Sequence, residues 1–420
     1  MKQIHYLILL LSFNGLVTKS PLYAQSTTDF EKVDCLKEEV ICLDKIQKVF
    51  DWSKQHASKL YLEVERTKKF PRSVGKGLRE IRDWTSGFLP GIFWLLYEYN
   101  GDDELRQKAA FLTALLEEEK NNIVDHDIGF RIYSSYGRGF HLLNDPDYKQ
   151  VIIDAANSAI VRYNPKVKAI KSWEPNLKRD WKFPVIIDNL MNLELLFAAT
   201  EMTGDSIYYD IAVQHAYTTK KHHYRSDFST SHVIDFDPET GSFRKRDWNN
   251  GHGDVDTTTW SRGQSWGLYG YTMAYRFTEN KDFLKQAEDI GQFLLNHPNM
   301  PEDYIPYWDY SYDGSSDTRD ASAAAILASG LLELSQYSKE YGEWFFQYAV
   351  KILNSLQTTS YMAEPHTNHN FLLKRATGNF TRNSEVDGPL IYADYYFLEA
   401  MMRYAKMTNQ FDSITLNQID

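Results

Sequence analysis

The chain has 420 residues, of which 43% are hydrophobic and 15% aromatic, which is enough for a large packed core. Its formal net charge of −11 argues against nucleic acid as a partner, because nucleic-acid binding depends on neutralising phosphates with Lys and Arg. An anionic ligand would need a locally basic pocket within this acidic protein. No Pro-, Gly- or Ser-rich linker divides the sequence, so we expect one large domain.

The N-terminus has the pattern of a secretory signal. Lys2 gives a positive start, Tyr6 to Val17 form a short apolar run, and Ala24 supplies a small residue at a cleavage point. A membrane span needs about 20 apolar residues, and no segment reaches that length. We therefore expect a signal peptide at residues 1–24, no membrane span, and export to the periplasm or the medium.

The chain has two cysteines, Cys35 and Cys42. Seven residues apart on one helix, they would be separated by about 10 Å, which is too far for a disulfide. They could pair only if the segment were a loop, and we expect two unpaired thiols.

Helical periodicity dominates the remainder, and a diffuse repeat recurs along it. In each copy an apolar helical run ends, a short polar turn follows, and Asp or Ser is placed to cap the next helix. The copies are Tyr99–Arg106, Leu143–Lys149, Met202–Tyr209 and Phe277–Phe283. Such helix hairpins build either an open solenoid or a closed (α/α)6 barrel. The expected organisation is an N-terminal extension at 25–44 and one all-α domain at 45–420.

The first two polar clusters each precede a helix. Trp84 lies beside Gly87 and Pro90 just before an apolar run, so its ring could face a cavity or simply pack beside a turn. His126 and Asp127 lie just before another helix, where Asp127 could face a ligand or cap the helix. No third metal ligand recurs at helical spacing, so we expect neither a metal nor another cofactor.

The third cluster is a helix expected to begin near Pro184, which suits a first turn. On it, Asp188 is flanked by aliphatic residues. Burial there would raise the pKa of the carboxyl group, as a general acid near neutral pH requires. The alternative is an Asp paired with Asn192 or with a neighbouring helix. Farther on, residues 231–243 alternate like a β-hairpin that turns at 238–241.

The fourth cluster, residues 251–269, crowds polar and aromatic side chains against a glycine-rich turn. Arg262 could bind a carboxylate through two hydrogen bonds, or it could pair with Asp254 or Asp256. Those two aspartates also suggest Ca²⁺, but no bidentate Glu follows at the spacing of an EF-hand loop.

Together these motifs resemble glycoside hydrolase family 88. The similarity spans roughly Ile46 to Ala405, and five motifs occur in the family's order: Trp84–Gly91, His126–Phe130, Ile187–Asn192, Trp260–Trp266 and Ile391–Glu399. The resemblance implies an (α/α)6 barrel with long active-site loops and a site at one open end. It implies Asp188 as catalytic acid and base, with Asp127 assisting. It also implies that the residues in contact with the sugar are Trp84, His126, Trp173, His232, His252, Arg262 and Trp266.

The activity implied by the resemblance is removal of a 4,5-unsaturated uronic acid from oligosaccharides made by polysaccharide lyases. We expect the protein to be a monomer or a homodimer. A region that contacts sulfate in some relatives corresponds to Asn368–Asp387, which lacks their Ser-x-x-Lys pattern. Together with the expected export, the missing pattern favours a plant or algal uronate polymer such as ulvan over mammalian glycosaminoglycans. Three alternatives remain: an unsaturated rhamnogalacturonyl hydrolase, an inverting glycosidase on the same barrel, and a glycan-binding protein.

Overall fold

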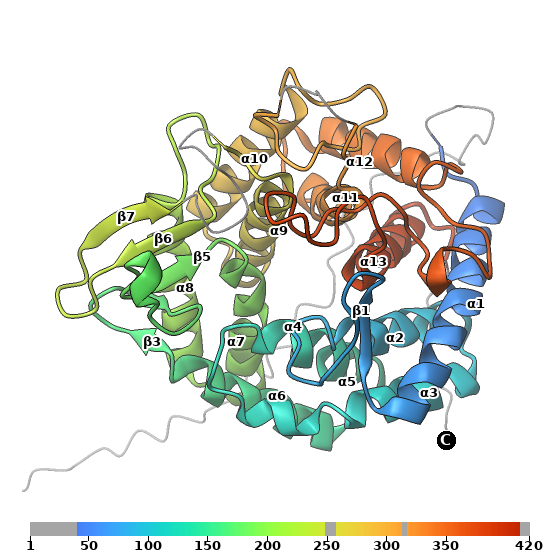
Figure 1. Cartoon of the computed structure of the whole chain (residues 1–420), viewed down its shortest axis with the longest axis horizontal. Coiled ribbons are helices and arrows are strands. Elements are labelled where there is room, and N and C mark those ends of the chain that lie inside the picture. Colours follow the sequence, from blue (N-terminus) through green and yellow to red (C-terminus); the bar gives the residue numbers. More distant parts are fainter. Residues whose placement is uncertain (1–39, 248–257, 313–316, 412–420) are drawn as a thin grey trace, which may run out of the picture.

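The computed structural model, described for residues 40–247, 258–312 and 317–411, is a double ring of helices (Figure 1). The inner helices are α2 (Phe88–Asn100), α4 (Ile128–Ile132) with α5 (Arg138–Leu143), α7 (Asn189–Thr203), α9 (Ser261–Thr278), α11 (Ala321–Ser335) and α13 (Ile391–Met407). The outer helices are α1 (Leu43–Thr67), α3 (Asp103–Ala114), α6 (Pro146–Ile160), α8 (Ser206–His222), α10 (Lys281–Leu295) and α12 (Gly342–Leu356). A π-helical turn, Tyr133–Gly137, joins α4 to α5.

Four hairpins turn in the same way at the points where the repeat was predicted. An inner helix ends at a residue with positive φ, and the side chain of the next residue accepts a hydrogen bond from the backbone two positions on. The pairs are Gly101–Asp102, Asn144–Asp145, Gly204–Asp205 and Glu279–Asn280. The repeat therefore marks real helix boundaries.

The ring is closed, which confirms the barrel and rules out the open solenoid. Neighbouring inner helices contact each other from α2 round to α13, and α13 contacts α2. The sixth hairpin is formed by the first and last of the described helices, since α1 packs outside α13. The backbone N–H of Ile41 donates to the Tyr404 hydroxyl at 3.1 Å, and Gln410 Nε2 donates to the Ile41 carbonyl at 2.9 Å.

The two rings differ in burial as their positions require. Every residue of α11 from Ala321 to Leu334 is buried, whereas α10 buries only one face. Small residues let inner helices approach closely: a Cβ on Gly91 would lie 2.5 Å from the Tyr395 ring and 2.6 Å from the Ser134 carbonyl oxygen. None of the described helices is long and apolar enough to cross a membrane.

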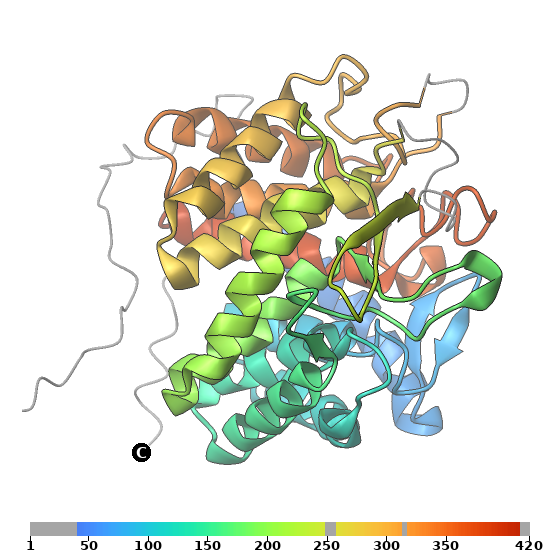
Figure 2. The same cartoon turned by 90° about the vertical axis from the view of Figure 1, so that its left-hand side faces the viewer.

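Short strands occur between the hairpins. β1 (Phe70–Ser73) pairs with β2 (Gly77–Arg79), β3 (Tyr163–Asn164) with β4 (Ala169–Ile170), and β5 (Pro184–Ile186), β6 (Val233–Phe236) and β7 (Phe243–Asp247) form an antiparallel sheet. The β6–β7 pairing confirms the predicted hairpin. Figure 2 shows this sheet and the long connections at one end of the barrel, to the right, with the short turns at the other.

Two expectations were wrong. Pro184 begins strand β5, and the helix begins only at Asn189. Because β5 is an edge strand, the missing proline N–H costs no ladder hydrogen bond. Cys42 is disulfide-bonded rather than a free thiol. The argument against pairing assumed a continuous helix, but the Cys42 backbone is extended, and α1 starts after it. Residues 1–24 and Cys35 lie outside the described residues.

Candidate active site

Most candidate site residues lie in the connections that enter the inner helices, at one end of the barrel, and Arg262 and Trp266 lie in the first two turns of α9. Within its described parts, the chain makes these connections at 68–87, 115–127, 161–188, 223–260, 296–320 and 357–390. Each inner helix, or the α4–α5 pair, therefore starts at this end, where the long connections lie together (Figures 1 and 2).

Two carboxylates stand directly before inner helices. Asp127 precedes α4 and Asp188 precedes α7, and neither side chain caps its own helix. Near α4, the carboxylate that accepts hydrogen bonds is that of Asp125. It accepts from the Asp127 N–H at 2.9 Å and from Arg131 Nη2 at 2.7 Å. The prediction that Asp127 caps a helix is therefore wrong, and neither carboxylate is engaged by the helix that follows it.

The spacing between α4 and α7 is fixed by close packing. Asn192, one turn into α7, accepts from the Phe130 N–H at 2.9 Å through its side-chain oxygen. A Cβ on Gly129 would lie 2.7 Å from the Asn192 Cα, so only glycine fits there. Asn192 thus joins the two helices that present Asp127 and Asp188, and it does not pair with Asp188.

The electrostatics of the pair favour a proton on Asp188. Burial, and then the negative charge of Asp127, raise the pKa of Asp188 to about 7, while Arg262 opposes the rise. Burial also raises the pKa of Asp127, with His126 opposing. The Asp188 side chain is 19% exposed, so solvent reaches it, and its Oδ1 accepts no hydrogen bond from a described residue. The protonation of Asp188 therefore depends on the charge of Asp127.

A buried histidine stands beside each carboxylate. His232 Nδ1 lies 3.6 Å from Asp188 Oδ1, and His126 Nε2 lies 3.4 Å from Asp127 Oδ1. The β5–β6 pairing sets the first contact, because the Ile187 N–H donates to the His232 carbonyl at 3.1 Å. Burial lowers the pKa of His232 well below its ordinary value, so this imidazole is neutral at pH 7.

An arc of rings and one guanidinium continues from His232. The ring centroids of His232 and Trp260 are 4.7 Å apart. Arg262 lies over Trp260 at 4.5 Å and over Tyr392 at 5.3 Å, and the Tyr392 ring lies 4.8 Å from Trp84. Trp84 is half-buried, while Trp260 and Tyr392 are buried, so Trp84 is the member of the arc that solvent reaches most easily.

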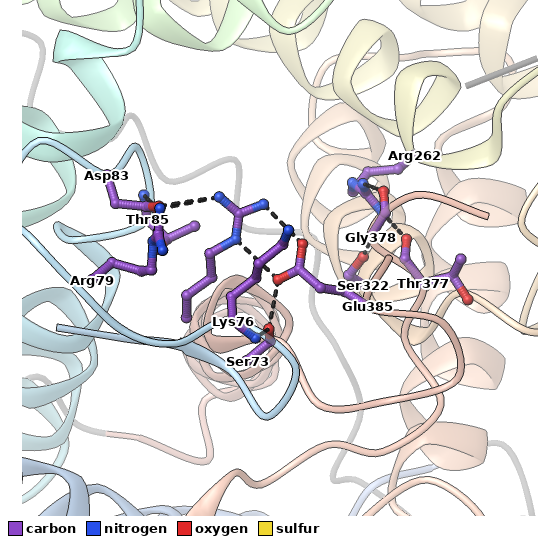
Figure 3. A network of polar contacts seen from close by, with 11 residues as sticks. Ser73, Lys76, Arg79, Asp83, Thr85, Arg262, Ser322, Thr377, Gly378 and Glu385 are labelled. Carbon is purple, nitrogen blue, oxygen red and sulfur yellow. Dashed lines mark hydrogen bonds and ion pairs between the residues drawn. The ribbon is translucent and has the colours of Figure 1, made fainter. Parts of the chain in front are cut away.

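Arg262 is held by hydrogen bonds to other parts of the protein. Nη1 donates to Asp320 Oδ2 at 2.7 Å. Nη1 also donates to the Thr377 carbonyl, and Nη2 donates to the Gly378 carbonyl at 2.7 Å (Figure 3). Its partner is therefore Asp320; Asp254 and Asp256 lie outside the described residues. The buried guanidinium joins α9 to α11 and to the loop before α13, and its charge still acts on Asp188.

The two remaining tryptophans are packed in different ways. Trp266 is 1% exposed, with its ring 5.3 Å from that of Phe130, so its indole is part of the barrel core. Trp173 is half-buried 5.3 Å from Trp181, and the segment just before it is held by the Ser172 hydroxyl, which accepts from the Ile186 N–H at 2.9 Å. His252 lies outside the described residues.

Sequence reasoning did not identify four residues around this site: Arg72, Asp320, Glu385 and Tyr392. Tyr392 lies within a motif that was noticed, but Arg72 and Glu385 are 313 positions apart, and no local pattern links them. Their pairing becomes visible only when the ring closes. The described residues contain no group of three or more His, Cys, Asp or Glu side chains arranged to hold a metal ion.

Comparison with known proteins adds independent evidence. The model of Glycosyl Hydrolase Family 88 matches residues 49–369. An unsaturated glucuronyl hydrolase from Formosa agariphila is 47% identical over 80% of this chain and 84% of its own length. An unsaturated chondroitin disaccharide hydrolase from Streptococcus pyogenes is 32% identical over 78% of this chain and 83% of its own.

Solved structures agree with these sequence matches. A crystal structure of an unsaturated glucuronyl hydrolase specific for heparin superposes with a TM-score of 0.82 and 41% identity, over 87% of this chain and 98% of that one. A mutant of the Streptococcus agalactiae enzyme in complex with dGlcA-GalNAc6S superposes with a TM-score of 0.72 and 27% identity, over 89% and 96% of the two chains.

Proposed function

The chain belongs to glycosyl hydrolase family 88 and is a hydrolase, and on this premise we propose that it removes a terminal 4,5-unsaturated uronic acid from oligosaccharides released by polysaccharide lyases. The observation that carries the proposal is Asp188, whose pKa is raised to about 7 beside a second carboxylate. Such a group can hold a proton at neutral pH and still act as a base once the proton has left.

The chemistry suits a single acid that becomes a base. The C4=C5 double bond of the substrate is an enol ether conjugated to a carboxylate. Protonated Asp188 gives its proton to C4, and positive charge develops at C5. The resulting Asp188 carboxylate then takes a proton from the water that attacks C5, which restores the acid. The C5 hemiketal opens to a ketone and leaves a hemiacetal at C1. That hemiacetal collapses to an aldehyde, and the neighbouring sugar leaves as an alcohol.

This route does not involve displacement at the anomeric carbon. The rule that relates carboxylate separation to retention or inversion concerns attack at C1, and it does not apply here. Asp127 is assigned two roles: its charge keeps the pKa of Asp188 high, and its oxygens contact sugar hydroxyls. His232 and His126, each beside one carboxylate, are assigned to the same sugar.

For the polysaccharide itself we propose a plant or algal uronate polymer such as ulvan. Support comes from the missing Ser-x-x-Lys pattern in residues 368–387 and from the export signal expected at residues 1–24. We likewise propose that the protein works in the periplasm or outside the cell. The competing substrates are glycosaminoglycan fragments, because relatives are named for chondroitin disaccharides and for heparin.

The decisive test is the loss of ultraviolet absorbance of the conjugated double bond. The panel contains oligosaccharides generated by lyases from ulvan, chondroitin sulfate, heparin and rhamnogalacturonan, with saturated analogues as controls. Absorbance loss on an unsaturated glucuronyl substrate supports the proposal. Cleavage of the saturated analogues would indicate a conventional inverting glycosidase. Activity confined to the rhamnogalacturonan product would indicate the related rhamnogalacturonyl hydrolase.

A further inference from the structure

The loop before α13 contains a short hairpin, residues 376–388, that is fastened on both sides of the site. Backbone bridges join Ala376 to Gly388 and Asn379 to Ser384, and the Gly378 N–H donates to the Glu385 carbonyl at 2.7 Å. Figure 3 shows polar contacts leaving this hairpin toward β1 in one direction and toward Arg262 in the other.

On the first side, Glu385 binds the N-terminal part of the chain. Its carboxylate accepts from Arg72 Nε at 2.9 Å, from Arg72 Nη2 at 2.8 Å and from the Ser73 hydroxyl at 2.6 Å. The Glu385 side chain is only 3% exposed. A bidentate pair of this kind fixes orientation as well as distance.

Arg72 carries the connection on to the segment that holds Trp84. Its Nη1 lies 3.1 Å from Asp83 Oδ2, and Asp83 Oδ1 accepts from the Thr85 N–H at 3.1 Å and from the Thr85 hydroxyl at 2.7 Å. The Arg72 guanidinium also lies 5.9 Å from the Trp84 ring centroid. Trp84 is thus flanked by two residues that this network holds.

On the second side, the same hairpin holds Arg262. The carbonyls of Thr377 and Gly378 accept from its guanidinium, as does Asp320. Gly378 also packs directly against Glu385: a Cβ at Gly378 would lie 2.7 Å from the Glu385 Cβ. Movement of Glu385 would therefore displace the carbonyls that orient Arg262.

We propose that the Arg72–Glu385 pair is a clamp that positions both Trp84 and Arg262, so that Arg72 and Glu385 are positioning residues for the reaction. The pair is expected to contribute little to the free energy of unfolding, because desolvation offsets much of the attraction between buried charges. Its geometric effect is larger, since it joins the connection before α2 to the connection before α13 across the seam of the ring.

The kinetic test rests on the proposed function and uses the full chain with an unsaturated disaccharide. The variants are Glu385→Gln, Arg72→Lys and the double variant, with Glu333→Gln as the matched control. Glu333 is likewise buried and pairs with Arg403 and Arg276, but it lies at the opposite end of its helix from Asp320. The clamp is proposed to hold Trp84 and Arg262, which are assigned to sugar contacts, so we expect each clamp variant to raise KM. Because misplacement of about 1 Å can cost about 100-fold, kcat/KM should fall at least about tenfold.

The double variant shows whether Arg72 and Glu385 act as one pair or independently. If Arg72 and Glu385 act through one pair, the double variant loses no more kcat/KM than the worse single variant. The Glu333→Gln control is expected to lower the melting temperature without raising KM. Additive losses in the double variant, or an unchanged KM in Glu385→Gln, would overturn the proposal.

A second measurement does not depend on activity. Hydrogen exchange followed by mass spectrometry in Glu385→Gln is expected to speed up in residues 376–388 and 82–88 together, at least several-fold, while α7 and α11 keep the wild-type rate. If Glu385→Gln does not fold, Arg72→Lys carries the same test. Exchange confined to 376–388 would refute the clamp, even if the enzyme proved to have another substrate. Inactivity of the wild-type chain on unsaturated disaccharides would instead refute the proposed function.

Discussion

Replacing Asp188 by Asn keeps the size of the side chain but removes the proton that the proposed reaction moves. An amide can neither protonate C4 nor accept the proton from water. General acid–base catalysis contributes about 100- to 10,000-fold, so turnover of an unsaturated disaccharide is expected to fall by at least about 100-fold. Binding is expected to persist, because Trp84 and the Arg262 network do not depend on Asp188.

The pKa of Asp188 predicts how wild-type turnover depends on pH, and the variant is compared with that dependence. With a pKa of about 7, the protonated fraction of Asp188 is about 0.9 at pH 6 and about 0.1 at pH 8, so wild-type turnover should fall about tenfold across that range. The residual activity of Asp188→Asn should lack this alkaline decline, since no proton is left to lose.

The assay is the initial rate of absorbance loss from pH 5 to 9, together with calorimetric titration of the disaccharide into the variant. Circular dichroism shows whether the variant is folded. An Asp188→Asn enzyme that is folded, binds substrate and turns over at near the wild-type rate would refute the mechanism. Loss of binding together with turnover would instead assign Asp188 to substrate recognition.

Three further outcomes follow from the same site. Asp127→Asn removes the negative neighbour that raises the pKa of Asp188, so turnover should fall and the alkaline limb of the pH–rate profile should move to lower pH. Because the folded-state pKa of Asp188 is raised, its contribution to stability is fully present below its ordinary pKa and is lost as pH rises through about 7. Asp188→Asn should therefore have a higher melting temperature than wild type at pH 8, and the difference should narrow at pH 5. Arg262→Lys keeps the charge but cannot reach Asp320 and two carbonyls at once, so kcat/KM should fall at least about tenfold, and unchanged kinetics would remove Arg262 from the site.

The parts of the fold that were predictable are those governed by neighbouring residues. The Gly101–Asp102 and Gly204–Asp205 turns follow from left-handed backbone and side-chain capping, both of which act within a few residues. The error at Pro184 has the same origin, because a first helical turn and an edge strand tolerate proline equally. Only the pairing with Asp235 in β6 decides between them.

In the candidate site, too, the residues with a local sequence signal could be predicted and those with distant partners could not. Asp127 and Asp188 could be selected because each stands before an apolar helical run. Whether Arg262 faces ligand or protein could not be derived, because its partners Asp320 and Gly378 are 58 and 116 residues away. Contacts at that separation depend on how the helical ring closes, and no local pattern encodes them.

The segregation of short turns to one end of the barrel and long connections to the other has a consequence for how such a chain can diversify. The turns at one end are minimal, so an insertion there would break a helix cap. At the opposite end the connections carry few of the contacts between inner helices, so they can lengthen, shorten or exchange side chains while the scaffold still assembles. New substrate preferences can therefore arise by changes in these long connections while the helical barrel still folds. The clamp between Arg72 and Glu385 is the exception, because it ties two of those adaptable connections to each other, and they must change in concert.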